Sequence, residues 1–147
     1  MKDYPHVEEP TLEEMKEGFH LKGKWKQDFF KNENPLVLEL GCGMGEYSVG
    51  LAEKFPEKNF LGVDIKGARI WQGATDALKK VLSNVGFLRI RIDWIETCFA
   101  QDEVDEIWIT FPDPQLKKRK GAKRLTHPDF LKRYNNILKK DGVIHLK

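Results

Sequence analysis

Residues 36–52 read LVLELGCGMGEYSVGLA and form the most informative stretch of the chain. An apolar run of strand length ends in a turn with three alternating glycines, and a helical pattern begins directly after the turn. Because glycine has no Cβ, the backbone can bend sharply and approach a ligand closely, and the helix start offers unpaired N–H groups to an anionic group. The stretch therefore predicts a strand, a ligand-binding turn at Gly41, Gly43 and Gly45, and a helix.

Apolar runs of strand length recur along the chain and alternate with helical patterns. Strands are expected at Leu36–Leu40, Asn59–Val63, Phe87–Ile92, Glu106–Phe111 and Val143–Leu146. Helices are expected at Glu46–Phe55, Ala68–Leu82, near Trp94–Ala100 and at Pro128–Leu138. This alternation is typical of βαβ crossovers, so it predicts an α/β fold with a doubly wound, mostly parallel sheet that helices cover on both faces.

The helical pattern over residues 68–82 predicts one apolar stripe that packs on the sheet. The stripe consists of Ile70, Trp71, Ala74, Ala77, Leu78 and Val81. Residues 1–34 are expected to form an N-terminal helical segment anchored in the core by Trp25, Phe29 and Phe30, and residues 35–147 the α/β core. A chain of 147 residues can build one hydrophobic core, so we expect effectively one domain.

The composition excludes several classes of protein. The chain has 25 Lys+Arg against 23 Asp+Glu, and Glu39 interrupts its longest apolar stretch, so neither a signal peptide nor a membrane span is expected. Cys42 and Cys98 have no CxxC neighbour, and the four histidines lack ligand spacing. We therefore expect reduced thiols, a cytoplasmic location and no metal.

Three acidic residues accompany the expected strand ends. Glu39 lies two residues before the first glycine, where a carboxylate disfavours a pyrophosphate and favours an ammonium group; the spacing GxGxG also differs from the dinucleotide fingerprint GxGxxG. Asp64 ends the second strand, where an acid accepts from ribose hydroxyls, and Asp93 closes the third strand and can accept from an adenine amino group. Together they predict a pocket for S-adenosylmethionine (SAM) and a Rossmann-like class I SAM-dependent methyltransferase.

The expected fourth strand leads into Phe111-Pro112-Asp113-Pro114 and then into a run of six bases and no acid from Lys117 to Arg124. The two prolines restrict the backbone and would hold Asp113 at the carboxyl edge of the sheet. A carboxylate can accept from two donors on a guanine edge, while lysine and arginine neutralise phosphates. This order of residues favours a nucleic-acid substrate.

Four segments carry a resemblance to a known family. The chain resembles the bacterial tRNA (guanine-N7)-methyltransferases over nearly its whole length, and FPDP followed by the basic run is the specific element. The segments are LELGCGMGEYSVGLA (38–52), FLGVDIKGARIW (60–71), DEIWITFPDPQLKKR (105–119) and KRLTHPDFLKRYNNILKKDGVIHLK (123–147).

The resemblance implies SAM-dependent methylation of a guanine N7 in the variable loop of tRNA. It implies cofactor contacts from Glu39, the glycine turn, Asp64 and Asp93, and it makes Asp113 the catalytic carboxylate. The implied substrate and tRNA contacts are Lys117, Arg119, Lys120, Lys123 and Arg124. Guanine N7 has an available lone pair, so the role of Asp113 stays open between orienting the base, stabilising charge and moving a proton.

Two departures from the family pattern stand out. Gln115 lies where many members have Trp, and the family's Thr-Asp after the fifth strand would fall beyond Lys147. We therefore expect a chain that lacks the last strands of the sheet, has weak or no catalytic activity, and self-associates through an exposed C-terminal strand.

Three alternatives remain at this point. Another SAM-dependent nucleic-acid methyltransferase acting on an exocyclic amine would also carry a proline-containing motif after its fourth strand. A nicotinamide-dependent oxidoreductase shares the strand, the glycine turn and the downstream acid, although Glu39 and the glycine spacing disfavour it. The third alternative is a tRNA-binding fold without catalytic activity.

Overall fold

Six strands form one parallel sheet in the computed structural model, which describes residues 4–42, 45–109 and 127–146. The strand order is β1-β4-β3-β2-β5-β6. The strands are β1 (Val7–Glu8), β2 (Leu36–Leu40), β3 (Asn59–Asp64), β4 (Val85–Arg89), β5 (Val104–Ile109) and β6 (Leu138–Leu146). The helices are α1 (Leu12–Glu17), α2 (Glu46–Lys54), α3 (Gly67–Lys79), α4 (Ile95–Cys98) and α5 (Pro128–Ile137), with a π-helical turn η1 (Trp25–Phe30) and a 3₁₀ turn η2 (Ile92–Trp94).

The strand order reverses at β2, which has β3 on one side and β5 on the other. Leu40, the last residue of β2, is in register with Val63 of β3 and with Ile109, the last residue of β5. The chain therefore leaves β2 and β5 side by side at the carboxyl edge. Open α/β sheets bind their ligands in the crevice at such a reversal.

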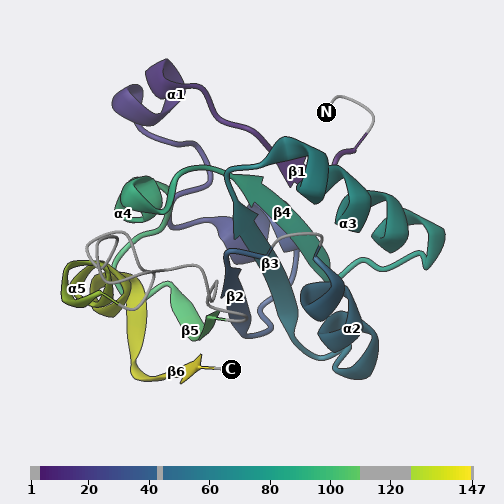
Figure 1. Cartoon of the computed structure of the whole chain (residues 1–147). Coiled ribbons are helices and arrows are strands. Elements are labelled where there is room, and N and C mark those ends of the chain that lie inside the picture. Colours follow the sequence, from purple (N-terminus) through teal and green to yellow (C-terminus); the bar gives the residue numbers. More distant parts are fainter. Residues whose placement is uncertain (1–3, 43–44, 110–126, 147) are drawn as a thin grey trace.

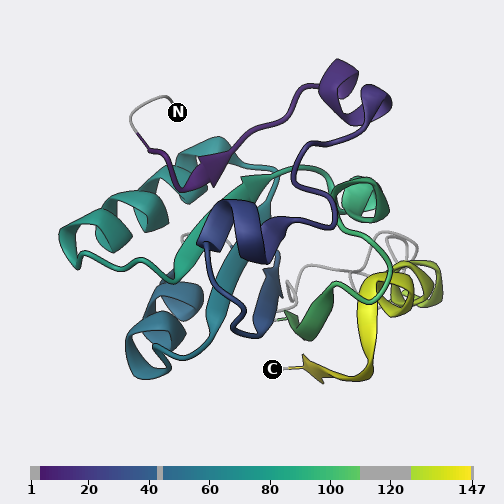
Figure 2. The same cartoon turned by 180° about the vertical axis from the view of Figure 1, so that it is seen from behind.

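Helices cover both faces of the sheet (Figures 1 and 2). One face packs against α2 and α3 through an apolar cluster that includes Val37, Phe60 and Phe87. On the opposite face, α4, α5 and η1 pack in a larger cluster, and Figure 2 shows the turn of residues 25–30 lying across the strands there. The central strands β2, β3, β4 and β5 contribute side chains to both clusters, as expected for strands buried on both sides.

The N-terminal residues are held by specific contacts. Thr11 caps α1 in a capping box with Glu14, and Trp25 of η1 is fully buried, stacked on Phe99 at 5.2 Å. The Trp25 Nε1–H donates to the Cys98 carbonyl at 2.8 Å. These residues share the cluster formed by α4 and α5, so they pack as part of the same core.

The expected α/β class and parallel sheet are confirmed, with differences at several elements. The third strand is Val85–Arg89 and not Phe87–Ile92, and the N-terminal region adds the strand β1 to its helical turns. The apolar stripe of α3 is narrower than expected, because Ile70, Ala74 and Ala77 are buried whereas Trp71 and Leu78 are 47% exposed. The helix ends at Lys79, before Val81, which has a positive φ of 56° and is 88% exposed.

Candidate functional site

The glycine turn after β2 has the backbone that its sequence predicts. Gly41 and Gly45 have φ angles of 69° and 73°, in the left-handed region that favours glycine. The amides of Gly41 and Cys42 both donate to the Val63 carbonyl, at 2.8 and 3.0 Å, so the turn is tied to β3. A Cβ at Gly45 would approach the Phe87 ring to 2.6 Å, so packing also requires glycine there. Gly43 lies outside the described residues.

Glu39 points from β2 toward the start of α2. Its carboxylate is only 3% exposed and accepts from the backbone N–H of Ser48 at 3.1 Å and from the Ser48 hydroxyl at 2.5 Å. Ser48 is in the first turn of α2, whose N–H groups lack helical partners, and a carboxylate is stabilised there. Glu39 therefore fixes the helix that follows the glycine turn, a partnership with Ser48 that the sequence motif does not reveal.

Asp64 is the last residue of β3, as expected. Its Oδ1 accepts from the backbone N–H of Ile65 at 2.7 Å and from that of Lys66 at 3.0 Å, which holds the carboxylate at the carboxyl edge of the sheet. The backbone carbonyl of Asp64 accepts from Ile90 at 3.0 Å and links the ends of β3 and β4. The side chain is thus oriented by its own turn.

Cys42 lies in the glycine turn, and its thiol is buried. Burial, with the negative charges of Glu39 and Asp64, holds the pKa of the Cys42 thiol well above its usual range. Cys42 stays a neutral thiol at neutral pH and is packed inside the turn. Glu39 and the described glycines lie at the end of β2, and Asp64 ends the neighbouring strand β3.

Asp93 occupies a different element from the one expected. It does not close the third strand, because β4 ends at Arg89 and Asp93 lies in the 3₁₀ turn η2, four residues later. Its side chain is 47% exposed and lies 3.5 Å from the Arg91 guanidinium. Its backbone carbonyl accepts from Arg133 of α5 at 3.0 Å. The strand ends earlier than expected because the backbone turns at Arg91, where the Trp94 N–H bonds the Arg91 carbonyl at 2.9 Å.

The expected substrate residues fall in the segment 110–126. Asp113, Lys117, Arg119, Lys120, Lys123 and Arg124 lie outside the described residues. The structure describes the chain up to Ile109, which ends β5 in register with Leu40. Leu40 ends β2, the strand that leads into the glycine turn. Asp113 follows Ile109 by four positions in the sequence.

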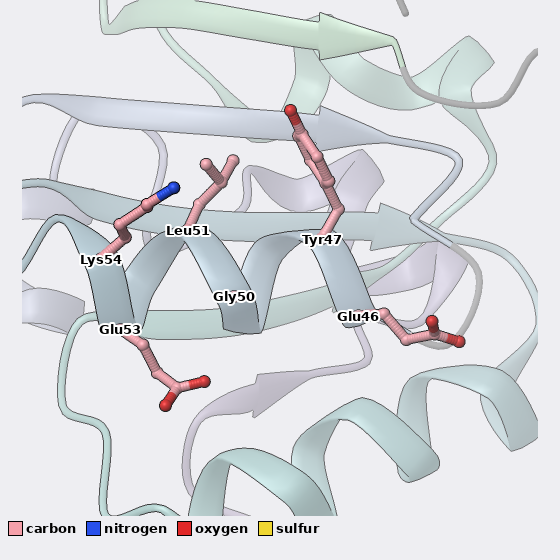
Figure 3. A pocket seen from close by; sticks show the side chains of 6 residues that line it. All are labelled: Glu46, Tyr47, Gly50, Leu51, Glu53 and Lys54. Carbon is pink, nitrogen blue, oxygen red and sulfur yellow. The ribbon is translucent and has the colours of Figure 1, made fainter.

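A separate hollow of about 560 Å³ lies along the outer side of α2 (Figure 3). Figure 3 shows Tyr47 and Leu51 pointing toward the neighbouring strands, while Glu46 and Glu53 point away from them. The Tyr47 ring lies 5.4 Å from Trp108, which stacks on His145 at 4.1 Å. Among the described residues, those that line this hollow belong to α2, from Glu46 at its start to Lys54 at its end.

Two further searches concern only the described part of the chain. Within residues 4–42, 45–109 and 127–146, no group of three or more His, Cys, Asp or Glu side chains is placed to hold a metal ion. None of the helices described there is long and apolar enough to cross a membrane.

The glycines and carboxylates at the carboxyl edge match the polar groups of SAM in chemical type. Left-handed glycines at both ends of the turn allow close approach of a ligand to the backbone, and the oriented Asp64 carboxylate can accept from a ribose diol. The buried Glu39 carboxylate adds negative charge beside the turn, which favours an ammonium group over a pyrophosphate. Asp93, exposed in η2, presents an acceptor for an amino group.

Solved structures share this fold. The antibiotic-resistance methyltransferase Kmr matches with a TM-score of 0.65 at 17% identity, covering 82% of this chain and 63% of that chain. PKMT2 from Rickettsia typhi, solved in complex with AdoHcy, matches with a TM-score of 0.59 at 23% identity, covering 76% of this chain and 20% of that chain. The expected class I methyltransferase fold is confirmed.

Sequence relatives extend the match. A protein of Christiangramia forsetii named tRNA (guanine-N(7)-)-methyltransferase is 58% identical over 98% of this chain, and one of the same name in Porphyromonas gingivalis is 54% identical over 100%. The chain spans 65% and 61% of the lengths of these two relatives. The family described as "Putative methyltransferase" matches residues 33–147. Since this match covers more than half of the chain, the chain belongs to that methyltransferase family.

Proposed function

We propose that the protein transfers a methyl group from SAM to N7 of a guanine in the variable loop of tRNA. The observation that carries this proposal is the 54–58% identity, over 98–100% of the chain, to two proteins named for that reaction. The site supports it, because the turn after β2 and the end of β3 place carboxylates and glycines where an adenosine with an amino acid group fits.

In this proposal the carboxyl edge holds the cofactor and the segment after β5 holds the substrate. The cofactor contacts are Glu39, Gly41, Gly43, Gly45, Asp64 and Asp93. SAM, when bound, supplies an electrophilic methyl group on a sulfonium. Ile109 and Leu40 end neighbouring strands in register, which supports a placement of Asp113 next to the cofactor.

The reaction does not require a strong general base. The N7 lone pair of guanine forms the bond to the methyl carbon while the carbon–sulfur bond breaks, and that electron pair stays on sulfur. No proton has to leave, so most of the acceleration comes from holding the two reactants in line. Such positioning can lower the activation barrier by about 7–11 kcal/mol. Asp113 orients the guanine and offsets the positive charge that the base acquires.

The basic run from Lys117 to Arg124 binds tRNA. Five basic residues neutralise backbone phosphates: Lys117, Arg119, Lys120, Lys123 and Arg124. Lys117 is the nearest of them in sequence to Asp113. We place the reaction in the cytoplasm, with tRNA as the macromolecular partner.

Ligand binding separates this proposal from a nicotinamide-dependent oxidoreductase. The full-length protein is titrated with S-adenosylhomocysteine and with NADH, and is then incubated with methyl-labelled SAM and tRNA that lacks N7-methylguanosine. We expect binding of the first ligand only and label in the tRNA. Binding of NADH without transfer of label would overturn the proposal.

A further inference from the structure

Arg133 of α5 contacts the turn that contains Asp93. Its Nη1 donates to the Asp93 carbonyl at 3.0 Å and lies 3.6 Å from a carboxylate oxygen of Glu96. Asn136, one turn later on α5, donates to the other oxygen of Glu96 at 2.8 Å. Two polar side chains of α5 thus bind the η2–α4 segment, and one of them, Arg133, holds the backbone of Asp93 itself.

The helix α5 that carries Arg133 is anchored in the hydrophobic core. Tyr134 and Ile137 are buried in the larger core cluster, and Phe130 packs partly buried against the same cluster. The helix is also fixed at its start, where the His127 ring accepts from the Asp129 N–H at 3.1 Å. Arg133 therefore projects from an anchored helix toward an exposed turn.

The turn needs such support because it is short. The 3₁₀ turn η2 has three residues and no side-chain cap, and the Asp93 side chain is 47% exposed with the Arg91 guanidinium 3.5 Å away. An exposed carboxylate on a three-residue turn loses rotational and backbone freedom when it receives a ligand. A guanidinium bound to the carbonyl of the same residue removes part of that freedom in advance.

We propose that Arg133 is a positioning residue for cofactor recognition: by holding the Asp93 backbone, it fixes the carboxylate that accepts from the adenine amino group. The proposal rests on the proposed function, because it takes the carboxyl edge as the SAM site. It makes α5, which follows the substrate segment in the sequence, part of the adenine subsite.

The test compares two ligands that differ at the amino group. S-adenosylhomocysteine carries the amine, and S-inosylhomocysteine carries an oxygen in its place, which a carboxylate acceptor disfavours. Dissociation constants for both are measured by calorimetry on the full-length protein, for the wild type, Arg133→Met and the control Asn136→Leu. The control removes the α5–Glu96 hydrogen bond and leaves the contact with Asp93 in place.

We expect the wild type to prefer the adenosyl ligand by about tenfold or more, the gain typical of a hydrogen bond to a charged group. Arg133→Met should reduce this preference to about two- to threefold, while Asn136→Leu should keep it. A loss of general stability would weaken both ligands equally and leave their ratio unchanged. If Arg133→Met does not fold, Arg133→Gln is measured by the same ratio, because it keeps a polar group but loses the charge that pairs with Glu96 and shortens the side chain that reaches the Asp93 carbonyl.

An unchanged ratio in the folded Arg133 variant, or an equal fall in the Asn136 control, would overturn the positioning role. Neither result affects the proposed function as long as the wild type binds S-adenosylhomocysteine and methylates tRNA. If the wild type fails to bind that ligand, the proposed function fails, and the role of Arg133 fails with it.

Discussion

Asp64 shows how a single residue prepares the site. Two backbone N–H groups of its own turn bind one oxygen of the carboxylate, so the direction of the side chain is set by the backbone before any ligand arrives. Glu39 is different, because its carboxylate is buried and bonded to Ser48 at the start of α2. Asp64 is thus oriented by its own turn, whereas Glu39 is oriented by the first turn of the following helix.

Replacing Asp64 by Ala should weaken the binding of SAM by about 1.5–3 kcal/mol, because charge-assisted hydrogen bonds to the ribose are lost. Calorimetry with S-adenosylhomocysteine measures the change. Asp76→Ala is the matched control, since Asp76 lies on α3 and pairs with Lys80 at 3.7 Å. Affinity equal to the wild type in the Asp64 variant would remove Asp64 from the pocket.

The buried thiol of Cys98 gives a prediction for pH. Burial raises its pKa from 9.0 to about 12, so at pH 8 the folded protein holds about a thousandfold less thiolate than an unfolded chain. Because the folded pKa is the higher one, the stabilising contribution is fully present below pH 9 and is lost as the pH rises toward 12.

The measurement is thiol labelling of a Cys42→Ala variant at pH 8, with and without denaturant. We expect Cys98 to react slowly in the native protein and rapidly once it is unfolded. Equal rates in the two conditions would show that Cys98 is not buried in solution.

Sequence periodicity predicts those helices and strands whose position depends on neighbouring residues in the chain. β2 falls at Leu36–Leu40 as expected, and α2 ends within one residue of the expected position. The two-residue strand β1 has no periodicity of its own and exists because Val7 pairs with Phe87 far along the chain. The sequence predicts that Asp93 closes the third strand, whereas the backbone turns into η2 there.

Other features depend on contacts between distant residues and carry no local signal. The exposure of Trp71 on α3 follows from which helix face meets the sheet, and Arg133 meets Asp93 only when α5 packs beside η2. The sequence therefore predicts the class of the fold, but not the contacts that hold Glu39, Asp64 and Asp93 in place.

Glu103 ties the N-terminal segment to the loop before β5. Its two carboxylate oxygens accept from the backbone N–H groups of Gly23 and Ala100 at 2.8 Å and of Trp25 at 3.1 Å. Glu103→Ala leaves these donors without that acceptor and should lower the free energy of unfolding by about 2 kcal/mol.

Urea denaturation of the Glu103 variant measures the loss. The neighbouring Asp102 is an exposed control with a φ of 60°, a conformation that Asn tolerates, so Asp102→Asn should stay within about 0.5 kcal/mol of the wild type. If the two variants are equally stable, Glu103 does not hold the N-terminal segment.

At the scale of the whole molecule, charge is segregated along the chain. Residues 98–114 hold five acids and no base, and residues 117–124 hold six bases and no acid, although the net charge is only +2. An uneven distribution of this kind favours an extended polyanion as the partner.

Replacing Lys117, Arg119, Lys120, Lys123 and Arg124 together by Gln should weaken tRNA binding and flatten its salt dependence. Each lost phosphate contact lowers the slope of log K against log salt by somewhat less than one unit. Titrations at several salt concentrations measure the slope, and Lys16 of α1 and Lys79 of α3, replaced together by Gln, serve as a control. A slope equal to that of the wild type would mean that the run makes no phosphate contacts.

The outer strand of the described sheet gives a prediction about assembly. β6 pairs with β5 on one side, and Val143 and Leu146 are 49% and 65% exposed. A strand with unpaired backbone groups and exposed apolar side chains is a template for another chain, so we expect the 147-residue chain to self-associate.

Light scattering tests this, with Val143→Lys expected to reduce association. Leu12→Lys, a change at an exposed position on α1, should leave association unaltered. A 147-residue chain that stays monomeric at all concentrations would contradict the prediction.

In the proposed function, the carboxylate of Asp113 presents guanine N7 to a methyl group held at the ends of β2 and β3. Its most direct test is nucleoside analysis of tRNA lacking N7-methylguanosine after incubation with methyl-labelled SAM and either the full-length wild type or Asp113→Ala. We predict label in N7-methylguanosine for the wild type, and no label for the variant while its affinity for S-adenosylhomocysteine is retained. Label in a nucleoside methylated on an exocyclic amine, or turnover of the Asp113 variant at the wild-type rate, would contradict the account.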